Sequence, residues 1–348
     1  MRIRFKPWAR PELEASKFYI NNPEDYKGKW KSLYKNNAPF HIELGCGKGS
    51  FISKLAVKNK NIKLTKQYNK ANIVTHSGTF HVDDVISTVF LSKIFKEINL
   101  IRIPSIENKN TNNKLVFDIG LGEFDHHQKN RNGKRENGIY YSSIGLLWKK
   151  YGKDYLKNIE VKNIDKVYEY MDKELIQYID ATDNMQMEYL KSKTSPDFVK
   201  LCNPEWNENV TEEEGFIHAL KLADEFWNIY IKHAIAEVEA IEIIINKIEE
   251  TNENYAIFDK ELPYRKAVDL LKNKNVKYLI FKSKRKCYDI RIIDKDMNFK
   301  KEIVINNIKQ ARSLSKISDL LYVDIRGKLC CTETLDSAIN LVKYNDRK

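Results

Sequence analysis

The chain has 348 residues, a length that is typical of two domains and excludes a single small module. With 42% hydrophobic and 31% charged residues, its composition is that of a folded globular protein and excludes wholesale disorder. The net charge of +12 is uneven, because residues 1–70 hold 16 Lys and Arg against 5 Asp and Glu, while the other residues hold 44 against 43.

The N-terminal segment contains a glycine-rich turn. Residues 38–56, APFHIELGCGKGSFISKLA, predict a strand, a tight turn and the start of a helix, as in the opening of a Rossmann fold. With MRIRFKPWAR and NNPEDYKGKW, this stretch resembles the start of bacterial tRNA guanine-N7 methyltransferases over about residues 1–56. The resemblance implies an S-adenosylmethionine loop made of Glu43, Gly45, Gly47 and Gly49.

The sequence after this turn does not continue as a methyltransferase. Such a sheet needs further strands and an acidic residue near the end of the second strand to hold the ribose, yet NIKLTKQYNK (61–70) has no carboxylate. We therefore predict that residues 1–70 are a basic leader with a partial, vestigial methyltransferase-like segment that does not use S-adenosylmethionine. Contact of its Lys and Arg residues with tRNA phosphates is a secondary hypothesis.

A first group of polar side chains lies in ANIVTHSGTFHVDDVISTVFLSKIF, which begins at residue 71. The pattern predicts a short strand, a polar loop and a helix, with His76, His81 and Asp83 where the strand ends and the helix begins. Ligands bind at the carboxyl ends of strands in open α/β sheets, which favours a site here. The alternative is that the histidines cap a turn and that Asp83 or Asp84 stabilises the helix N-terminus.

A second group follows in KLVFDIGLGEFDHHQ (114–128), where a buried strand leads to Asp118, a glycine turn and then Asp125, His126 and His127. Packing of a core does not require this combination, so we interpret it as functional. Adjacent histidines on an extended backbone should point in diverging directions, which lets one bind a metal while the other faces a phosphate or binds a second ion.

A third group, in QYIDATDNM (177–185), holds Asp180 and Asp183, which would share one face of a helix. Either carboxylate could complete the site, and the spacing does not choose between them. Mixed imidazole and carboxylate ligands suit Mn²⁺, Zn²⁺ or Fe²⁺, and the residues suffice for two ions. Hydrolysis of phosphoesters is the chemistry that such a pair of ions favours.

The motifs THSGTFHVDD, VFDIGLGEFDHH, KRENGIYYSSIGLLW and IDATDN together resemble the Myg-type branch of the DHH phosphoesterase superfamily, over about residues 72–345. The resemblance implies a metal-dependent hydrolase with exonuclease-like activity on nucleic acid. It also implies that His127, with Asp125, acts on the substrate phosphate. The implied metal ligands are His76, His81, Asp83, Asp118, His126 and either Asp180 or Asp183.

Two cations, Lys134 and Arg135, stand just before a helix that Ser142 or Ser143 would cap. We predict that they bind substrate phosphates, although a solvated basic loop is the alternative.

The remaining sequence predicts a long helix and a smaller domain. Residues 212–250 have apolar residues at helical spacing and contain only one glycine, and 275–293 predict a β-hairpin with a Lys-rich turn. Candidates for substrate contact in this domain are Lys282, Lys284, Arg285 and Arg291, but Asp324 stands where relatives often carry His, which makes that contact doubtful. The predicted divisions are 1–70 (leader), 71–211 (catalytic domain), 212–250 (linker helix) and 251–348 (C-terminal domain).

We thus predict an α/β fold in which a DHH-type parallel-sheet domain is joined by a long helix to a smaller α/β domain, after a partial Rossmann-like segment. The predicted function is cleavage of phosphodiesters in RNA or single-stranded DNA, with two Mn²⁺ ions. The alternatives are a tRNA methyltransferase, a non-catalytic metal- or nucleic-acid-binding module, and a phosphatase of small molecules. No apolar stretch predicts a membrane span or a signal peptide, and five cysteines without a CxxC predict reduced thiols in a cytoplasmic protein.

Overall fold

The computed structural model describes residues 62–129, 131–186, 188, 197–271, 275–304 and 307–347. The chain divides into two compact units, Met1–Lys60 and Asn61–Lys348. All described residues belong to the second unit. The predicted S-adenosylmethionine loop (Glu43, Gly45, Gly47 and Gly49) lies outside them.

The first domain is built on a parallel sheet of four short strands in the order β1-β3-β2-β4. The strands are β1 (Ile62–Leu64), β2 (Ile73–His76), β3 (Ile98–Ile103) and β4 (Leu115–Val116). Because β1 pairs with β3 along its length, the sheet begins before residue 71, at which we predicted the domain to begin. Ile62 and Leu64 alternate with Lys63, a pattern that suits an edge strand.

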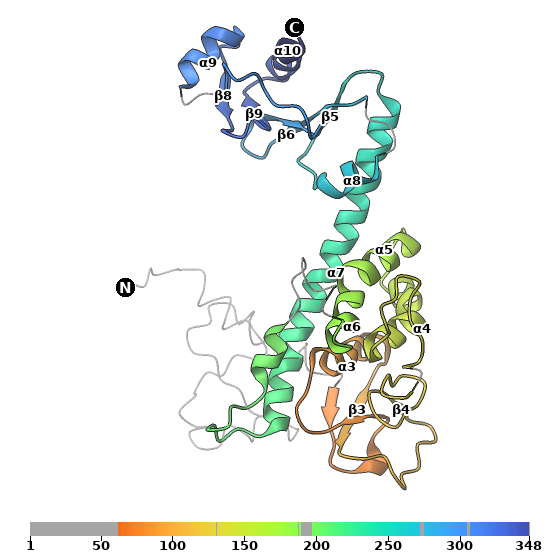
Figure 1. The fold of residues 1–348 in the computed structure, drawn as a ribbon. Coiled ribbons are helices and arrows are strands. Elements are labelled where there is room, and N and C mark those ends of the chain that lie inside the picture. The colour runs from red at the N-terminus through yellow and green to blue at the C-terminus, as the bar shows by residue number, and fades with distance from the viewer. Residues whose placement is uncertain are drawn as a thin grey trace, which may run out of the picture. The chain divides into compact units, whose positions relative to one another are not determined.

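Helices cover one face of this sheet (Figure 1). They are α3 (Val82–Ile94), α4 (Ser143–Asn158), α5 (Ile164–Met171) and α6 (Gln177–Asp183), with the one-turn π-helix η4 (Asp172–Ile176) between the last two. Two 3₁₀ turns, η3 (Tyr68–Lys70) and η6 (Asp197–Cys202), complete the domain.

Aromatic rings hold these helices together. The ring of Phe90 on α3 lies 5.3–5.6 Å from the rings of Trp148, Tyr155 and Trp227, which come from α4 and from the long helix described next. Large buried aromatic side chains of this kind dominate the energy of a core. The opposite face of the sheet has a smaller cover, in which Val74 and Ile101 pack against Tyr68.

Helix α7 spans Glu212–Glu250, the range over which the apolar spacing predicts a helix. Thr211 caps its start, because the Glu214 N–H donates to the Thr211 hydroxyl while the Thr211 N–H donates to the Glu214 carboxylate. Its residues from Phe216 to Val238 contribute to the core of the first domain, and its last turns contribute Ala240, Ile244 and Ile248 to the core of the second.

The C-terminal domain has a mixed five-stranded sheet in the order β5-β6-β7-β9-β8. The strands are β5 (Tyr255–Phe258), β6 (Tyr278–Lys282), β7 (Tyr288–Ile292), β8 (Leu320–Val323) and β9 (Leu329–Thr332). Strands β6 and β7 are antiparallel and form the predicted hairpin. The helices are α8 (Arg265–Leu270), α9 (Ile308–Ser315) and α10 (Leu335–Asp346), of which α9 and α10 lie beside β8 and β9 (Figure 1).

The two sheets and their helices confirm the predicted α/β class. None of the helices in the described part of the chain is long and apolar enough to cross a membrane.

Candidate metal centre

The polar residues that the sequence singles out converge at the carboxyl ends of two neighbouring strands. His76 is the last residue of β2, and Asp118 follows β4, which pairs with β2. The N-terminus of α3 adds its own side chains, because only five residues separate this helix from β2. The parallel pairing therefore brings together residues that are far apart in the chain.

Asp118 has a left-handed backbone conformation, with φ of +56°. Its N–H donates to the carbonyl of Phe124 at 3.0 Å, which closes the turn and brings Asp125 and His126 back to the strand end. A left-handed conformation is costly for a residue with a Cβ, and residues held this way cluster at functional sites.

The imidazole of His76 lies between two carboxylates. Its Nε2 is 3.2 Å from Asp84 Oδ2 and 3.2 Å from Asp118 Oδ2. Its Nδ1 lies 3.1 Å from the carbonyl oxygen of Ser77, which can only accept a hydrogen bond, so Nδ1 carries a proton. In the neutral ring Nε2 is then the free ligand atom, which is how a second hydrogen bond orients many metal-binding histidines.

His126 contacts Asp183 rather than Asp180. The Nε2 atom of His126 lies 2.8 Å from Asp183 Oδ2, and its Nδ1 lies 3.5 Å from Asp118 Oδ1. His81, at the start of α3, is more distant, with its Nδ1 4.0 Å from Asp183 Oδ1. Of the two carboxylates between which the sequence did not choose, Asp183 is the one that lies beside His126.

Asp180 points instead into the protein and is fully buried. It accepts hydrogen bonds from Arg135 Nη1 at 2.5 Å and from the N–H and hydroxyl of Ser142, at 3.0 and 2.5 Å. Arg135 also donates to Asp172 of η4. Arg135, which we predicted to bind substrate, is therefore held inside the domain between two carboxylates.

Asp83 is also occupied by protein donors. Its two oxygens accept from the backbone N–H groups of Ser143 and Ile144, at 3.0 and 2.7 Å, and Oδ1 lies 2.7 Å from the Ser142 hydroxyl oxygen. A carboxylate of α3 therefore satisfies the open N–H groups at the start of α4, which we expected a serine side chain to cap. Its oxygen still lies within 4.8 Å of the ligand atoms of His126 and Asp183.

The side chains of His126 and His127 do not diverge as expected, because their ring centroids are 4.2 Å apart. The segment forms no strand, so the alternation of an extended backbone does not apply. The rings differ in their partners. The Nδ1 atom of His127 lies 2.7 Å from Asp125 Oδ1, and the ring itself is largely exposed.

Burial and neighbouring charges shift the pKa values of these side chains in the metal-free protein. Burial lowers the pKa of His76, but hydrogen bonds to Asp118 and Asp84 outweigh it and raise the pKa to about 11. Burial likewise lowers the pKa of His126, which contact with Asp183 and the charge of Asp83 raise to about 9. Burial and the charge of Asp118 hold the pKa of Asp83 well above its usual range.

Some of the possible ligand atoms form no hydrogen bond within the protein. Among the described residues, Asp118 Oδ1 and His126 Nδ1 are buried and form no hydrogen bond, while the buried Asp84 Oδ2 contacts the ring of His76, itself a possible metal ligand. Buried polar atoms are normally satisfied, so such atoms indicate a missing ion. Three overlapping groups of ligand atoms could each hold a metal ion: His76, Asp84 and Asp118; Asp83, His126 and Asp183; Asp118, Asp125, His126 and His127. The residues therefore fit a divalent metal.

A hollow of about 650 Å³ opens above these residues. Its wall includes four residues that were not predicted as site residues, namely Thr79, Arg131, Asn184 and Met185. Arg131 Nη1 donates to Asn184 Oδ1 at 3.2 Å, while Lys134, which we predicted to bind substrate, is not part of the wall. Asp84 was likewise missed as a ligand, because the sequence shows only its position next to Asp83.

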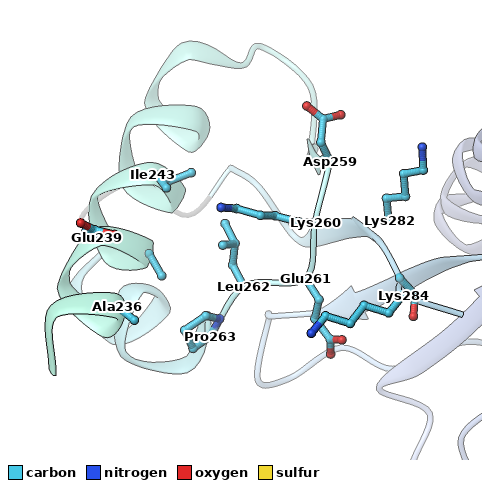
Figure 2. A pocket seen from close by; sticks show the side chains of 12 residues that line it. Ala236, Glu239, Ile243, Asp259, Lys260, Glu261, Leu262, Pro263, Lys282 and Lys284 are labelled. Carbon is cyan, nitrogen blue, oxygen red and sulfur yellow. The ribbon is translucent and has the colours of Figure 1, made fainter. Parts of the chain in front are cut away.

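The cations of the C-terminal hairpin lie elsewhere. Lys282 and Lys284 line a separate hollow of about 490 Å³ between α7, the residues after β5 and the β6–β7 turn, and Figure 2 shows Lys260 pointing toward α7 across it. Arg285 and Arg291 both contact Asp289. Asp324 accepts from Arg326 at 3.1 Å and is buried.

The model of the family MYG1_exonuc, described as Uncharacterised protein family (UPF0160), matches residues 72–345. No solved structure matches the chain.

Curated tRNA (guanine-N(7)-)-methyltransferases are also similar to the chain. That of Ruminiclostridium cellulolyticum is 40% identical over 121 residues, which cover 27% of this chain and 51% of that protein. The enzyme of Clostridium tetani is 33% identical over 161 residues (42% and 75%), and that of Clostridium beijerinckii is 55% identical over 62 residues (18% and 28%). The chain thus spans about half the length of the first of these relatives. Both resemblances predicted from the sequence are confirmed.

Proposed function

Over residues 72–345 the chain belongs to the MYG1_exonuc family, and on this premise we propose that it is a metal-dependent phosphoesterase that cleaves phosphodiester bonds in RNA or single-stranded DNA. The family and the groups of His and Asp side chains support a metal-dependent hydrolase. The bond that is cleaved, the nucleic-acid substrate and Mn²⁺ as the metal are part of the proposal.

One observation carries the proposal: the groups of ligand atoms overlap. Asp118 belongs both to the group of His76 and to a group that contains His126, and His126 also belongs to the group of Asp183. Overlapping groups are what two neighbouring ions require, because one carboxylate can serve both. When bound, divalent ions would supply Lewis acidity, which lowers the pKa of water and neutralises charge on a phosphoryl group.

The protein supplies orientation around these ions. The Ser77 carbonyl fixes the His76 ring, and the turn that begins at Asp118 brings His126 and His127 to the strand end. Helix α6 carries Asp183 to the metal centre. The buried carboxylate of Asp180, one turn earlier on α6, fixes this helix by accepting hydrogen bonds from Arg135 and Ser142. We infer that Asp180 is a positioning residue rather than a ligand.

His127 is suited to act on the phosphate. Asp125 Oδ1 accepts from both the backbone N–H and Nδ1 of His127, at 3.1 and 2.7 Å, which leaves Nε2 free to meet the substrate. The hydrogen bond to Asp125 raises the pKa of His127, so the ring favours its charged form and can donate a proton to a phosphate or leaving oxygen. Arg131, on the same wall, would bind a phosphate of the substrate.

End-labelled single-stranded RNA and DNA, incubated with the full chain and Mn²⁺, test this proposal. We expect cleavage by the wild type, its loss on chelation, and its loss in His126→Ala. Lys134→Ala, outside the hollow, is the matched control and should keep full activity. Metal binding without cleavage of either polymer would contradict the nuclease assignment, and hydrolysis of small phosphoesters alone would indicate a phosphatase instead.

A methyltransferase-related role is the second candidate, because relatives named tRNA (guanine-N(7)-)-methyltransferase match the N-terminal part of the chain. Under our proposal this part contributes no methyl transfer, and its basic residues add affinity for RNA. Transfer of labelled methyl groups from S-adenosylmethionine to tRNA by the full chain would favour the second candidate. A protein that binds metal and RNA but performs neither reaction would be a binding module.

A further inference from the structure

Two cysteines of the C-terminal domain lie side by side, far from the metal centre in sequence. Cys287 stands just before β7 and Cys331 lies on β9, and their Sγ atoms are 2.8 Å apart although 44 positions separate them. Both side chains are buried. Asp289, the partner of Cys331 in the sheet register, has its Oδ1 4.0 Å from Cys287 Sγ.

The sheet register explains this meeting. Residues two apart on a strand share a face, so Cys287 and Asp289 lie on one face, and Cys331 opposes Asp289 on that same face. Cys330, the neighbour of Cys331, lies on the other face, in the core with Ile290. Cys330 is therefore a matched control for Cys331, because it cannot reach Cys287.

The surroundings favour a bond between the sulfurs over a metal between them. Two sulfurs bound to one zinc ion at ~2.3 Å in tetrahedral geometry would be about 3.8 Å apart, which is farther than the distance observed here. The carboxylate of Asp289, the third ligand that a metal would need, is already held by Arg285 and Arg291, at 3.1 and 3.5 Å. The contact with Asp289 holds the guanidinium of Arg285 on the same turn as Cys287.

We propose that Cys287 and Cys331 form an oxidant-sensitive dithiol, which hydrogen peroxide converts into a disulfide between β7 and β9. The Cys287 sulfur attacks one oxygen of the peroxide, the O–O bond breaks, and a sulfenic acid and one water result. The Cys331 sulfur then attacks the sulfur of Cys287, the S–O bond breaks, and a second water leaves with the remaining thiol proton. Two thiols and one peroxide therefore give one disulfide and two waters, and a thiol reductant reverses the reaction.

The bond would fix the turn that carries Lys284. Ser283 and Cys287 close this turn, since the Ser283 N–H donates to the Cys287 carbonyl at 2.8 Å. Lys284, on the turn, lines the hollow beside α7 (Figure 2). Oxidation would thus link the β6–β7 turn, which lines that hollow, covalently to β9.

The test counts free thiols in the full chain before and after treatment with hydrogen peroxide, with labelling under denaturing conditions so that burial plays no part. The chain has five cysteines, so the wild type should fall from five free thiols to three. Cys331→Ser should keep its four, and so should Cys287→Ser. Cys330→Ala, the matched control, should fall from four to two.

Peptide mapping of the oxidised protein identifies the bond independently of the variants' folding. Trypsin should release residues 287–291 joined to residues 329–343, and in Cys330→Ala this link can only reach Cys331. Retention of all five thiols in the wild type would overturn the proposal, as would a bond to Cys46 or Cys202 instead.

Discussion

Replacing Asp180 or Asp183 by alanine should produce two different defects, although the residues are one helical turn apart. Asp180 is fully buried and accepts hydrogen bonds from the guanidinium of Arg135 and from two donors of Ser142. Asp183 lines the hollow and contacts Nε2 of His126. The first side chain should therefore serve stability, and the second should serve metal binding.

The magnitude for Asp180→Ala follows from its partners. Removal of one member of a buried ion pair costs about 3–5 kcal/mol, because the other charge stays buried. Arg135 keeps its contact with Asp172, which reduces the cost of leaving its charge buried. The buried N–H of Ser142 loses its acceptor, which costs about 1–3 kcal/mol. We expect the free energy of unfolding of the metal-free protein to fall by about 3–5 kcal/mol.

For Asp183→Ala the two contributions oppose each other. Loss of the contact with His126 destabilises the metal-free protein, while removal of one negative charge relieves the repulsion that raises the pKa of Asp83. The net change should be about 1 kcal/mol or less. The affinity for Mn²⁺ should fall by at least ~10-fold, since this variant removes an oxygen from the site itself.

Urea denaturation of the chelated proteins measures the first effect, and calorimetric titration with Mn²⁺ measures the second. Asp180→Asn is the control, because its amide oxygen still accepts from Ser142. Equal destabilisation by both alanine variants, or a greater loss of metal affinity in Asp180→Ala than in Asp183→Ala, would refute the assignment of roles.

Three further predictions follow from the same region. Gly145→Ala should destabilise the protein by about 1–3 kcal/mol, because a Cβ there would collide with the carboxylate of Asp180, and an unchanged urea midpoint would contradict this. Arg131→Ala should raise KM for single-stranded RNA at least ~10-fold and leave the calorimetric affinity for Mn²⁺ unchanged, and a loss of metal instead would make Arg131 a structural residue. The folded pKa values of His76 and His126, about 11 and about 9, lie above the unfolded value of about 6.5. Their contribution to the stability of the metal-free protein is therefore complete below about pH 6.5 and is lost as the pH rises through 9 and toward 11, which urea denaturation across this range measures. Mn²⁺ binding near neutral pH must displace these protons, so calorimetry in buffers of different ionisation heat should detect their release, and binding without proton release would contradict these pKa values.

The sequence predicted the parts of the site that depend on strand ends. His76 ends β2 and Asp118 follows β4, and parallel pairing of these strands suffices to bring both to one edge. Periodicity likewise predicted α7, because apolar spacing persists over its whole length.

Side-chain direction could not be predicted in the same way. Asp180 and Asp183 share a helix face, and only Arg135 and Ser142, which are remote in sequence, determine which of them points inward. The hydrogen bonds to Asp180 and Asp172 also hold Arg135 inside the domain, so it cannot bind substrate. Cys287 and Cys331 meet through strand register, which the spacing of the cysteines does not reveal.

The measurement that tests the central claim most directly is the number of Mn²⁺ ions bound by the full chain, by calorimetry, in the wild type and in Asp118→Asn. A centre whose ligand groups overlap at Asp118 predicts two ions per chain in the wild type and at most one, bound more weakly, in the variant. Absence of binding in the wild type, or two ions bound with unchanged affinity in Asp118→Asn, would contradict the account.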